Sequence, residues 1–364
     1  DTPAPGKYDA DERTTALKGR ATHNKQIASG KGTFMSSADQ DRSAPKMTEE
    51  TPDPSHYSDY YLKKQSIGNL KTANKHVRDG KIAFDNGRVF AATGYGQLAA
   101  LDAGSGAVLW SVDISAPARQ APAAAGDTVV AVTQTGEVHA VAQGDGTERW
   151  LYTGIAESAG LLAYANPAIA AGSVVVPFTS GEVMALDLKK GEPRWIEGVT
   201  RSYRTSAVAG LTDVAASPVI DGDLVIASGV SGRVVASRLK TGERIWEQDV
   251  GSQHTPIVSG GTVFLIDIDG RMVALSRKPG EPVWRTVLPN VENRKKGRIN
   301  WAGPVLANGV LVAVSSDGRL ARLDATSGQI LGTSQTGEDI YVTPIIAGGR
   351  MVTITAKGEV VAFN

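Results

Sequence analysis

The sequence contains no cysteine, has no excess of either charge, and lacks any apolar run long enough to cross a membrane. The absence of cysteine excludes disulfides, thiolate metal sites and a cysteine nucleophile. Because 38 acidic residues balance 38 basic ones, the basic excess typical of nucleic-acid-binding proteins is missing. No signal peptide is visible, and since the chain starts at Asp1 we expect a processed or trimmed chain.

Residues 1–60 have very little apolar content. Their only branched aliphatic residues are Leu17 and Ile27, and they contain no tryptophan. Such a segment cannot bury enough apolar surface to offset its chain entropy. We therefore predict an extended or disordered polar arm over 1–60 and a folded domain over 61–364, where short apolar runs alternate with glycines.

The folded part contains a repeat that begins with glycine, continues with alternating apolar residues and ends in most copies with tryptophan. Its leading glycines are spaced 40, 45, 51, 38, 48 and 40 residues apart. The sixth copy has Gly332 in place of the tryptophan, and the seventh stops at the chain end. The copies are GQLAALDAGSGAVLW (96–110), GEVHAVAQGDGTERW (136–150), GEVMALDLKKGEPRW (181–195), GRVVASRLKTGERIW (232–246), GRMVALSRKPGEPVW (270–284), GRLARLDATSGQILG (318–332) and GEVVAFN (358–364).

Each unit is interpreted as four short antiparallel strands separated by glycine turns, with one face of each strand buried. Repeats of this length predict an all-β fold, a β-propeller of four-stranded blades. Seven blades are counted, with eight as the alternative. The last unit has room for three strands, so we predict that an N-terminal strand, Tyr60–Gly68, closes the ring.

One tryptophan recurs at the same position in most blades, which is typical of a residue that packs between neighbouring blades. The alternative is a set of ligand-stacking aromatics, but we favour structural blade-packing. Trp301 is out of register and is expected in a loop insertion. The five recurring residues are Trp110, Trp150, Trp195, Trp246 and Trp284.

The sequence shows no pattern that predicts catalysis, a cofactor or a metal. Its five histidines lack metal-ligand spacing, and His139, within a strand, is expected to face the surface. Asp267–Gly270 slightly resembles a calcium loop, but the further ligands are missing. We interpret this segment as an ordinary hairpin turn and the protein as a binding scaffold, not an enzyme.

Two long insertions, 155–167 and 198–218, interrupt the repeat. Both connect one blade to the next, so they should emerge on the same face, where long loops on a rigid scaffold concentrate binding residues. Leucines with charged neighbours fit a protein-binding patch with an apolar centre and a polar rim. The alternative is that the leucines only cap a blade end. The predicted partner-binding residues are Leu161, Leu162, Arg201, Arg204 and Asp213.

The repeat resembles the pyrroloquinoline-quinone (PQQ)-like propeller repeat. Within that group, three segments resemble the BamB family of α-proteobacteria, and the resemblance covers about residues 60–364. The segments are AESAGLLAYANPAIAAGSVVVPFTSGEVMALD, LTDVAASPVIDG and NWAGPVLANGVLVAVSSDGRL. The resemblance implies an eight-bladed periplasmic lipoprotein on the inner face of the outer membrane. It also implies docking onto the POTRA domains of BamA and help with the insertion of outer-membrane barrels.

Family residues that contact BamA carry over to both insertions. In the first, Ala159, Leu161 and Leu162 match, with Leu162 where the family has arginine; in the second, Asp213 matches and Ala215 replaces an aspartate. Unfolded outer-membrane proteins are a second partner class. Membrane contact is expected only through an N-terminal lipid, on a cysteine that the printed sequence does not contain.

Two other functions remain open at this stage. A propeller of this kind could serve another envelope complex or bind a polysaccharide. A quinoprotein dehydrogenase is less favoured, because those enzymes are longer and usually use an adjacent cysteine pair, which is absent here.

Overall fold

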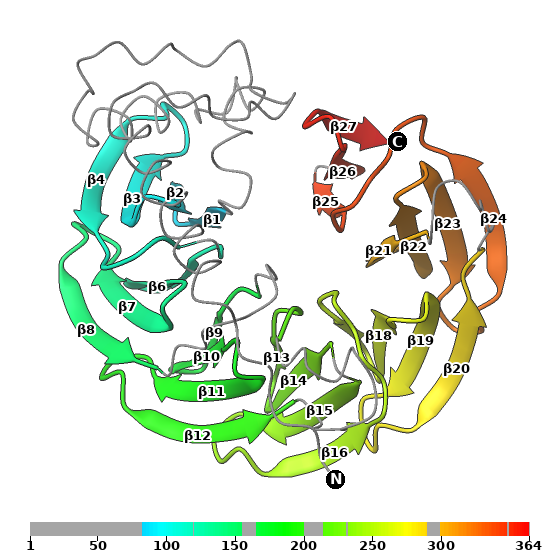
Figure 1. The fold of residues 1–364 in the computed structure, drawn as a ribbon, viewed down its shortest axis with the longest axis horizontal. Helices are drawn as coiled ribbons and strands as arrows, with labels where there is room; N and C mark the ends of the chain where they lie inside the picture. Colours follow the sequence, from blue (N-terminus) through cyan, green and yellow to red (C-terminus); the bar gives the residue numbers. More distant parts are fainter. Residues whose placement is uncertain are drawn as a thin grey trace, which may run out of the picture. The chain divides into compact units, whose positions relative to one another are not determined.

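The chain forms seven antiparallel β-sheets that follow one another in chain order. The computed structural model describes residues 82–118, 120–154, 165–199, 214–230, 232–289, 299–347 and 349–363, all within the unit Pro54–Asn364. Every regular element in these ranges is a strand. Figure 1 shows the sheets arranged around a common axis, with the first strand of each innermost. The predicted all-β propeller with seven blades is therefore confirmed.

The first four blades contain four strands each, paired in sequence order. Blade 1 comprises β1 (Ile82–Asp85), β2 (Arg88–Ala92), β3 (Gln97–Asp102) and β4 (Val108–Asp113). Blade 2 comprises β5 (Ala123–Ala125), β6 (Thr128–Val132), β7 (Glu137–Ala142) and β8 (Glu148–Thr153). Blade 3 comprises β9 (Ala168–Ala170), β10 (Ser173–Pro177), β11 (Glu182–Asp187) and β12 (Pro193–Gly198). Blade 4 comprises β13 (Val219–Asp221), β14 (Leu224–Gly229), β15 (Arg233–Arg238) and β16 (Arg244–Gln248).

The remaining blades follow the same order, except that three strands are described in the last. Blade 5 comprises β17 (Ile257–Ser259), β18 (Thr262–Ile266), β19 (Arg271–Ser276) and β20 (Pro282–Val287). Blade 6 comprises β21 (Trp301–Ala307), β22 (Val310–Ser315), β23 (Arg319–Asp324) and β24 (Ile330–Gln335). Blade 7 comprises β25 (Ile345–Ala347), β26 (Arg350–Ile354) and β27 (Val360–Phe363). The predicted closing strand, Tyr60–Gly68, lies outside the described residues.

Glycine and proline lie where the turn chemistry requires them. Gly96, between β2 and β3, has a φ of 79°, and a Cβ there would lie 2.8 Å from the carbonyl oxygen of Ile114. Only glycine fits that turn without strain. Pro122 and Pro167 directly precede β5 and β9, where the missing N–H is tolerated. Pro304 differs, because it lies within β21 at a break in the pairing register.

Burial differs from the prediction of one buried face per strand. All residues of β6, β10 and β14 are buried, and the third strands β3, β7, β15 and β19 are each buried at four consecutive positions, on both faces. The reason is that each middle strand lies between two neighbouring blades. The alternation survives on outer strands such as β4 and β8, where a buried tryptophan lies between exposed neighbours.

The five recurring tryptophans lie at the interfaces between successive blades. Each indole N–H donates to a backbone carbonyl of the next blade, at donor–acceptor distances between 2.7 and 3.2 Å. Each ring also packs against the glycine between the third and fourth strands of that blade. The pairs are Trp110 with Gln143 and Gly146, Trp150 with Leu188 and Gly191, Trp195 with Leu239 and Gly242, Trp246 with Arg277 and Gly280, and Trp284 with Ala325 and Gly328.

Two expectations for single aromatic side chains were wrong. Trp301 does not lie in a loop: it is the first residue of the inner strand β21 and is 5% exposed. His139, expected at the surface, is buried in β7. Its Nε2 lies 3.1 Å from Ser115 Oγ, which also donates to Glu137. The blade-1 connection therefore covers His139. In the described part of the chain, no helix has the length and apolarity needed to span a membrane.

Candidate partner-binding face

One end of the propeller carries the connections between successive blades together with the turns between second and third strands. We call this end the loop face. Gly154 N donates to the Gly136 carbonyl at 3.0 Å, and Val199 N donates to the Gly181 carbonyl at 2.9 Å. These bonds hold the start of each insertion against the adjacent turn. Both insertions therefore leave the propeller on the loop face.

A chain of hydrogen bonds links the residues that precede the first strands of blades 2 to 5. Ala121 N donates to Asn166 Oδ1 at 2.9 Å, Asn166 N donates to Ser217 Oγ at 2.8 Å, and Ser217 N donates to Thr255 Oγ1 at 3.2 Å. We call this series the polar girdle. It ends at Thr255, because the next residue before a proline, Gly303, has no side-chain acceptor.

The girdle joins the far ends of the two insertions directly, since Asn166 lies at the end of the first and Ser217 at the end of the second. Their apolar neighbours Ala165, Val199 and Val214 are buried in a single cluster between blades 3 and 4. The described ends of the two insertions thus lie side by side on packed stems. This is the kind of rigid base on which binding loops are presented.

The predicted partner-binding residues lie beyond these stems. Leu161 and Leu162 fall in the first insertion, and Arg201, Arg204 and Asp213 fall in the second; all five lie outside the described residues. Their contacts therefore remain predictions. The girdle residues Asn166 and Ser217 were not predicted, although a signal was present: a polar residue directly before the proline that opens a blade.

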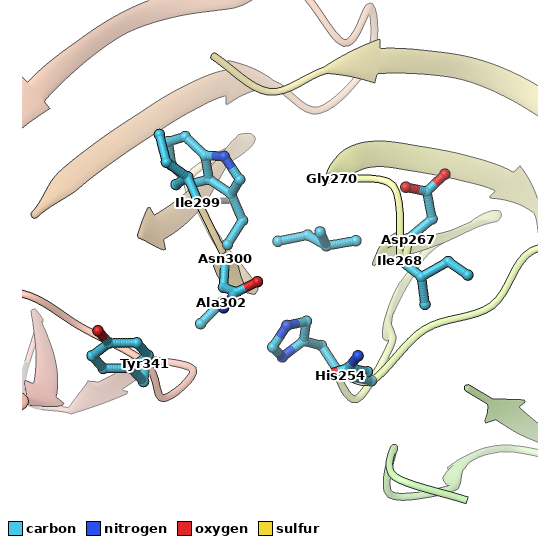
Figure 2. A pocket seen from close by; sticks show the side chains of 11 residues that line it. His254, Asp267, Ile268, Gly270, Ile299, Asn300, Ala302 and Tyr341 are labelled. Atoms are coloured by element: carbon cyan, nitrogen blue, oxygen red, sulfur yellow. The ribbon is translucent and has the colours of Figure 1, made fainter. Parts of the chain in front are cut away.

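Further along the loop face, a cavity of about 350 Å³ lies where blades 5, 6 and 7 meet. It is lined by residues that precede β17 and β25, by the start of β21 with the two residues before it, and by the end of β18 with the β18–β19 turn. Figure 2 shows Asn300 and Ala302 on one side, Asp267 and Ile268 on the other, and Tyr341 on a third segment. The lining residues are Gln253, His254, Ile266, Asp267, Ile268, Gly270, Ile299, Asn300, Trp301, Ala302 and Tyr341.

The charge at this cavity is largely neutralised. Asp267 accepts from the backbone N–H groups of Asp269 and Arg271 at 2.9 and 2.8 Å, and Arg271 Nε donates to Asp267 at 2.6 Å. These bonds also form the predicted hairpin turn. Burial lowers the pKa of His254, and a hydrogen bond with the Trp301 backbone opposes this lowering without cancelling it. The imidazole is therefore neutral near pH 7.

The described ranges contain no group of three or more histidine, aspartate or glutamate side chains that could hold a metal ion. The loop face combines the hydrogen-bonded ends of two insertions with a cavity lined by aliphatic and polar residues.

The repeat, the blade geometry and the interblade tryptophans define a class of protein, the β-propellers built from PQQ-like repeats. A family model described as outer membrane protein assembly factor BamB matches residues 62–286 and 290–364. The chain belongs to this family, and the resemblance inferred from the repeat is confirmed.

Named relatives agree with this membership, and solved structures share the fold. Outer membrane protein assembly factor BamB of Moranella endobia is 24% identical over 78% of this chain and 71% of its own length. That of Yersinia pestis is 23% identical over 81% and 74%. The crystal structure of BamB from Moraxella catarrhalis has a TM-score of 0.69 at 23% identity, covering 78% of this chain and 84% of that chain. A europium-containing methanol dehydrogenase, with a TM-score of 0.57 at 15% identity over 77% and 71%, shares the fold.

Proposed function

We propose that the chain is a non-enzymatic periplasmic scaffold of the outer-membrane β-barrel assembly machinery. Family membership supports the role in outer-membrane protein assembly. The scaffold docks onto POTRA domains of a BamA-like protein and assists the insertion of barrel proteins, with unfolded outer-membrane proteins as a second partner class. Its place is the inner face of the outer membrane, reached through an N-terminal lipid.

The observation that carries the docking proposal is the hydrogen bond that joins the described ends of the two insertions. Asn166 and Ser217, from connections about fifty residues apart, are hydrogen-bonded at 2.8 Å. A partner domain that contacts one loop therefore meets the other, so both contribute to one interface. Leu161 and Leu162 would supply its apolar centre, and Arg201, Arg204 and Asp213 its polar rim.

A capture experiment tests this surface. Immobilised BamA POTRA domains from the same organism are presented with the wild-type chain and with a variant carrying Leu161→Ala, Leu162→Ala and Asp213→Ala. Truncating the two central leucines together with one carboxylate of the rim should lower the affinity by at least about tenfold. Unchanged capture would refute the proposed surface.

The matched control lies on the opposite end of the propeller. Lys189 and Lys190 are exposed in the turn between β11 and β12, far along the strand from the loop face. The double variant Lys189→Ala, Lys190→Ala should be captured like the wild type. A loss of capture in this control would mean that binding depends on general surface charge.

The shared fold with a methanol dehydrogenase favours one further comparison. Reconstitution with PQQ and calcium should give no quinone absorbance if the chain is only a scaffold. A stoichiometric quinone spectrum would contradict the non-enzymatic assignment. Purification of the chain from a native membrane extract separates the remaining alternatives. We expect BamA to co-purify, whereas a role in another envelope complex or in polysaccharide binding predicts that other molecules co-purify instead.

A further inference from the structure

Trp301 differs from the five other tryptophans in its hydrogen bonding. Those five donate their indole N–H groups to backbone carbonyls of the next blade. Trp301 is 5% exposed, yet within the described part of the chain its Nε1 has no hydrogen-bond partner. A buried donor without an acceptor costs roughly 1–3 kcal/mol. An acceptor supplied from outside the chain would remove this cost.

The unpaired indole belongs to the wall of the loop-face cavity. Trp301 and Gly270 both line it, and a Cβ placed on Gly270 would come within 3.9 Å of Trp301 Cδ1, the carbon next to Nε1. Gly270, which has no side chain, therefore lies beside the pyrrole edge of the indole. Trp301 is a buried part of this wall, whereas Tyr341, another lining residue, is 56% exposed.

The walls determine the chemistry of an occupant. Ile266, Ile268 and Ile299 provide aliphatic surface. Asp267, the one charged side chain among the eleven described lining residues, is already paired with Arg271. Because the low pKa of His254 keeps it neutral, the cavity offers no free charge to an ion. Its surface suits an uncharged, partly apolar group that carries a hydrogen-bond acceptor.

Size and position favour a peptide residue over a larger cofactor. A volume of about 350 Å³ is at the small end of the range for ligand pockets. The cavity opens on the loop face, and His254 directly precedes Thr255, the last residue of the polar girdle. A protein bound to the insertions would bring its backbone close, and every backbone residue provides a carbonyl acceptor.

We infer that this cavity receives one uncharged apolar residue of an extended segment of the docked partner, whose backbone carbonyl accepts the Trp301 indole N–H. Figure 2 shows His254 between the Asn300–Ala302 wall and the Asp267–Ile268 wall. In this arrangement the aliphatic walls hold the side chain and the polar rim contacts the flanking peptide groups. The inference rests on the proposed function only for the identity of the partner.

The first test uses N-acetyl-L-leucine amide as the probe and needs no partner protein. Spectra of ¹⁵N-labelled protein contain six indole N–H signals, and Trp301→Phe assigns the one from Trp301. Addition of the probe should shift that signal downfield in a saturable way. The other five should stay, because their donors are already bonded. No saturable shift up to the solubility limit of the probe would overturn the inference.

A charged substitution at the cavity mouth provides the variant. Ile268→Glu should weaken probe binding at least about tenfold, since an unpaired carboxylate beside an apolar ligand is costly. The matched control is Ile196→Glu, the same change at an exposed isoleucine of the outer strand β12, which should bind like the wild type. Equal binding by both variants would overturn the assignment of the site.

Two further measurements fix the ligand class and the source of the peptide. Methyl β-D-glucopyranoside should not shift the Trp301 signal, and a tighter saturable response to this sugar would overturn the peptide assignment. Capture by POTRA domains should fall with Ile268→Glu but not with Ile196→Glu. If the probe binds the wild type but Ile268→Glu is captured by POTRA domains as well as the wild type, POTRA domains are refuted as the source of the peptide. If the probe binds but POTRA domains do not capture the wild type at all, the proposed function is refuted and the cavity assignment stands.

Discussion

Replacing Gly191 by alanine should disrupt the interface between blades 2 and 3. Gly191 lies between β11 and β12 with a φ of 72°, and a Cβ there would come 2.6 Å from the Trp150 ring. Trp150 also donates its indole N–H to the Leu188 carbonyl at 2.9 Å. The added methyl group therefore cannot fit unless the tryptophan moves and this hydrogen bond is strained.

The same blade provides a control with the same backbone conformation. Gly172, between β9 and β10, also has a φ of 72°, but nothing lies within 4 Å of its added Cβ. A left-handed alanine costs roughly 1–2 kcal/mol, offset by roughly 0.4–1 kcal/mol because the unfolded chain loses entropy. Gly172→Ala should thus lower the free energy of unfolding by about 1 kcal/mol.

Gly191→Ala carries the same backbone cost plus overpacking of roughly 1–3 kcal/mol. We therefore expect a total loss of about 2–4 kcal/mol. Equilibrium urea unfolding of both variants and the wild type measures the difference through the transition midpoints, compared at equal slopes. Equal midpoints for Gly191→Ala and Gly172→Ala would refute the claim that close packing of the turn against the tryptophan stabilises the interface.

Three further predictions concern stability and acid sensitivity. Because burial lowers the pKa of His254, the unfolded state takes up this proton more readily, and the protein loses stability as the pH falls below about 6.5. His254→Gln should therefore lose less stability than the wild type between pH 7 and pH 5, measured as the shift of the urea unfolding midpoint. Trp195→Phe, which loses the 2.8 Å bond to Leu239, should cost about 1 kcal/mol, against roughly 3–5 kcal/mol for Trp195→Ala; wild-type stability of Trp195→Phe would contradict a role for the hydrogen bond. Asn166→Ala removes the acceptor for Ala121 N and should lower the free energy of unfolding by about 1–3 kcal/mol. It should also weaken capture by POTRA domains; capture at wild-type strength would show that the girdle does not position the insertions.

The architecture is predictable because the repeated residues have repeated physical tasks. Glycine at each leading position supplies the positive φ of the second turn, as at Gly96. Proline marks the entry to a blade, as at Pro122 and Pro167. These requirements are local, so they can be inferred from spacing alone. The count of seven blades and the family resemblance followed from the same repeats.

Features that depend on the neighbouring blade could not be inferred in this way. A strand such as β10 is buried on both faces because two blades cover it, whereas alternation within one segment indicated a single buried face. His139 is covered by the blade-1 connection around Ser115. The side-chain acceptors of Asn166 and Ser217 form a series only after the ring brings consecutive connections together.

The tryptophans show how these two kinds of information combine. A repeated tryptophan has a repeated acceptor, since each next blade presents a carbonyl and a glycine turn to the ring. In blade 6, Gly332 stands at the position of the tryptophan. The next blade, blade 7, has three described strands. Its described residues therefore contain no turn between a third and a fourth strand that a tryptophan of blade 6 could contact. Trp301 lies outside the repeat, and among the described residues its buried indole N–H has no acceptor. A repeated residue thus serves the scaffold, whereas the unpaired donor of Trp301 is the basis of our proposal that a bound partner supplies the acceptor.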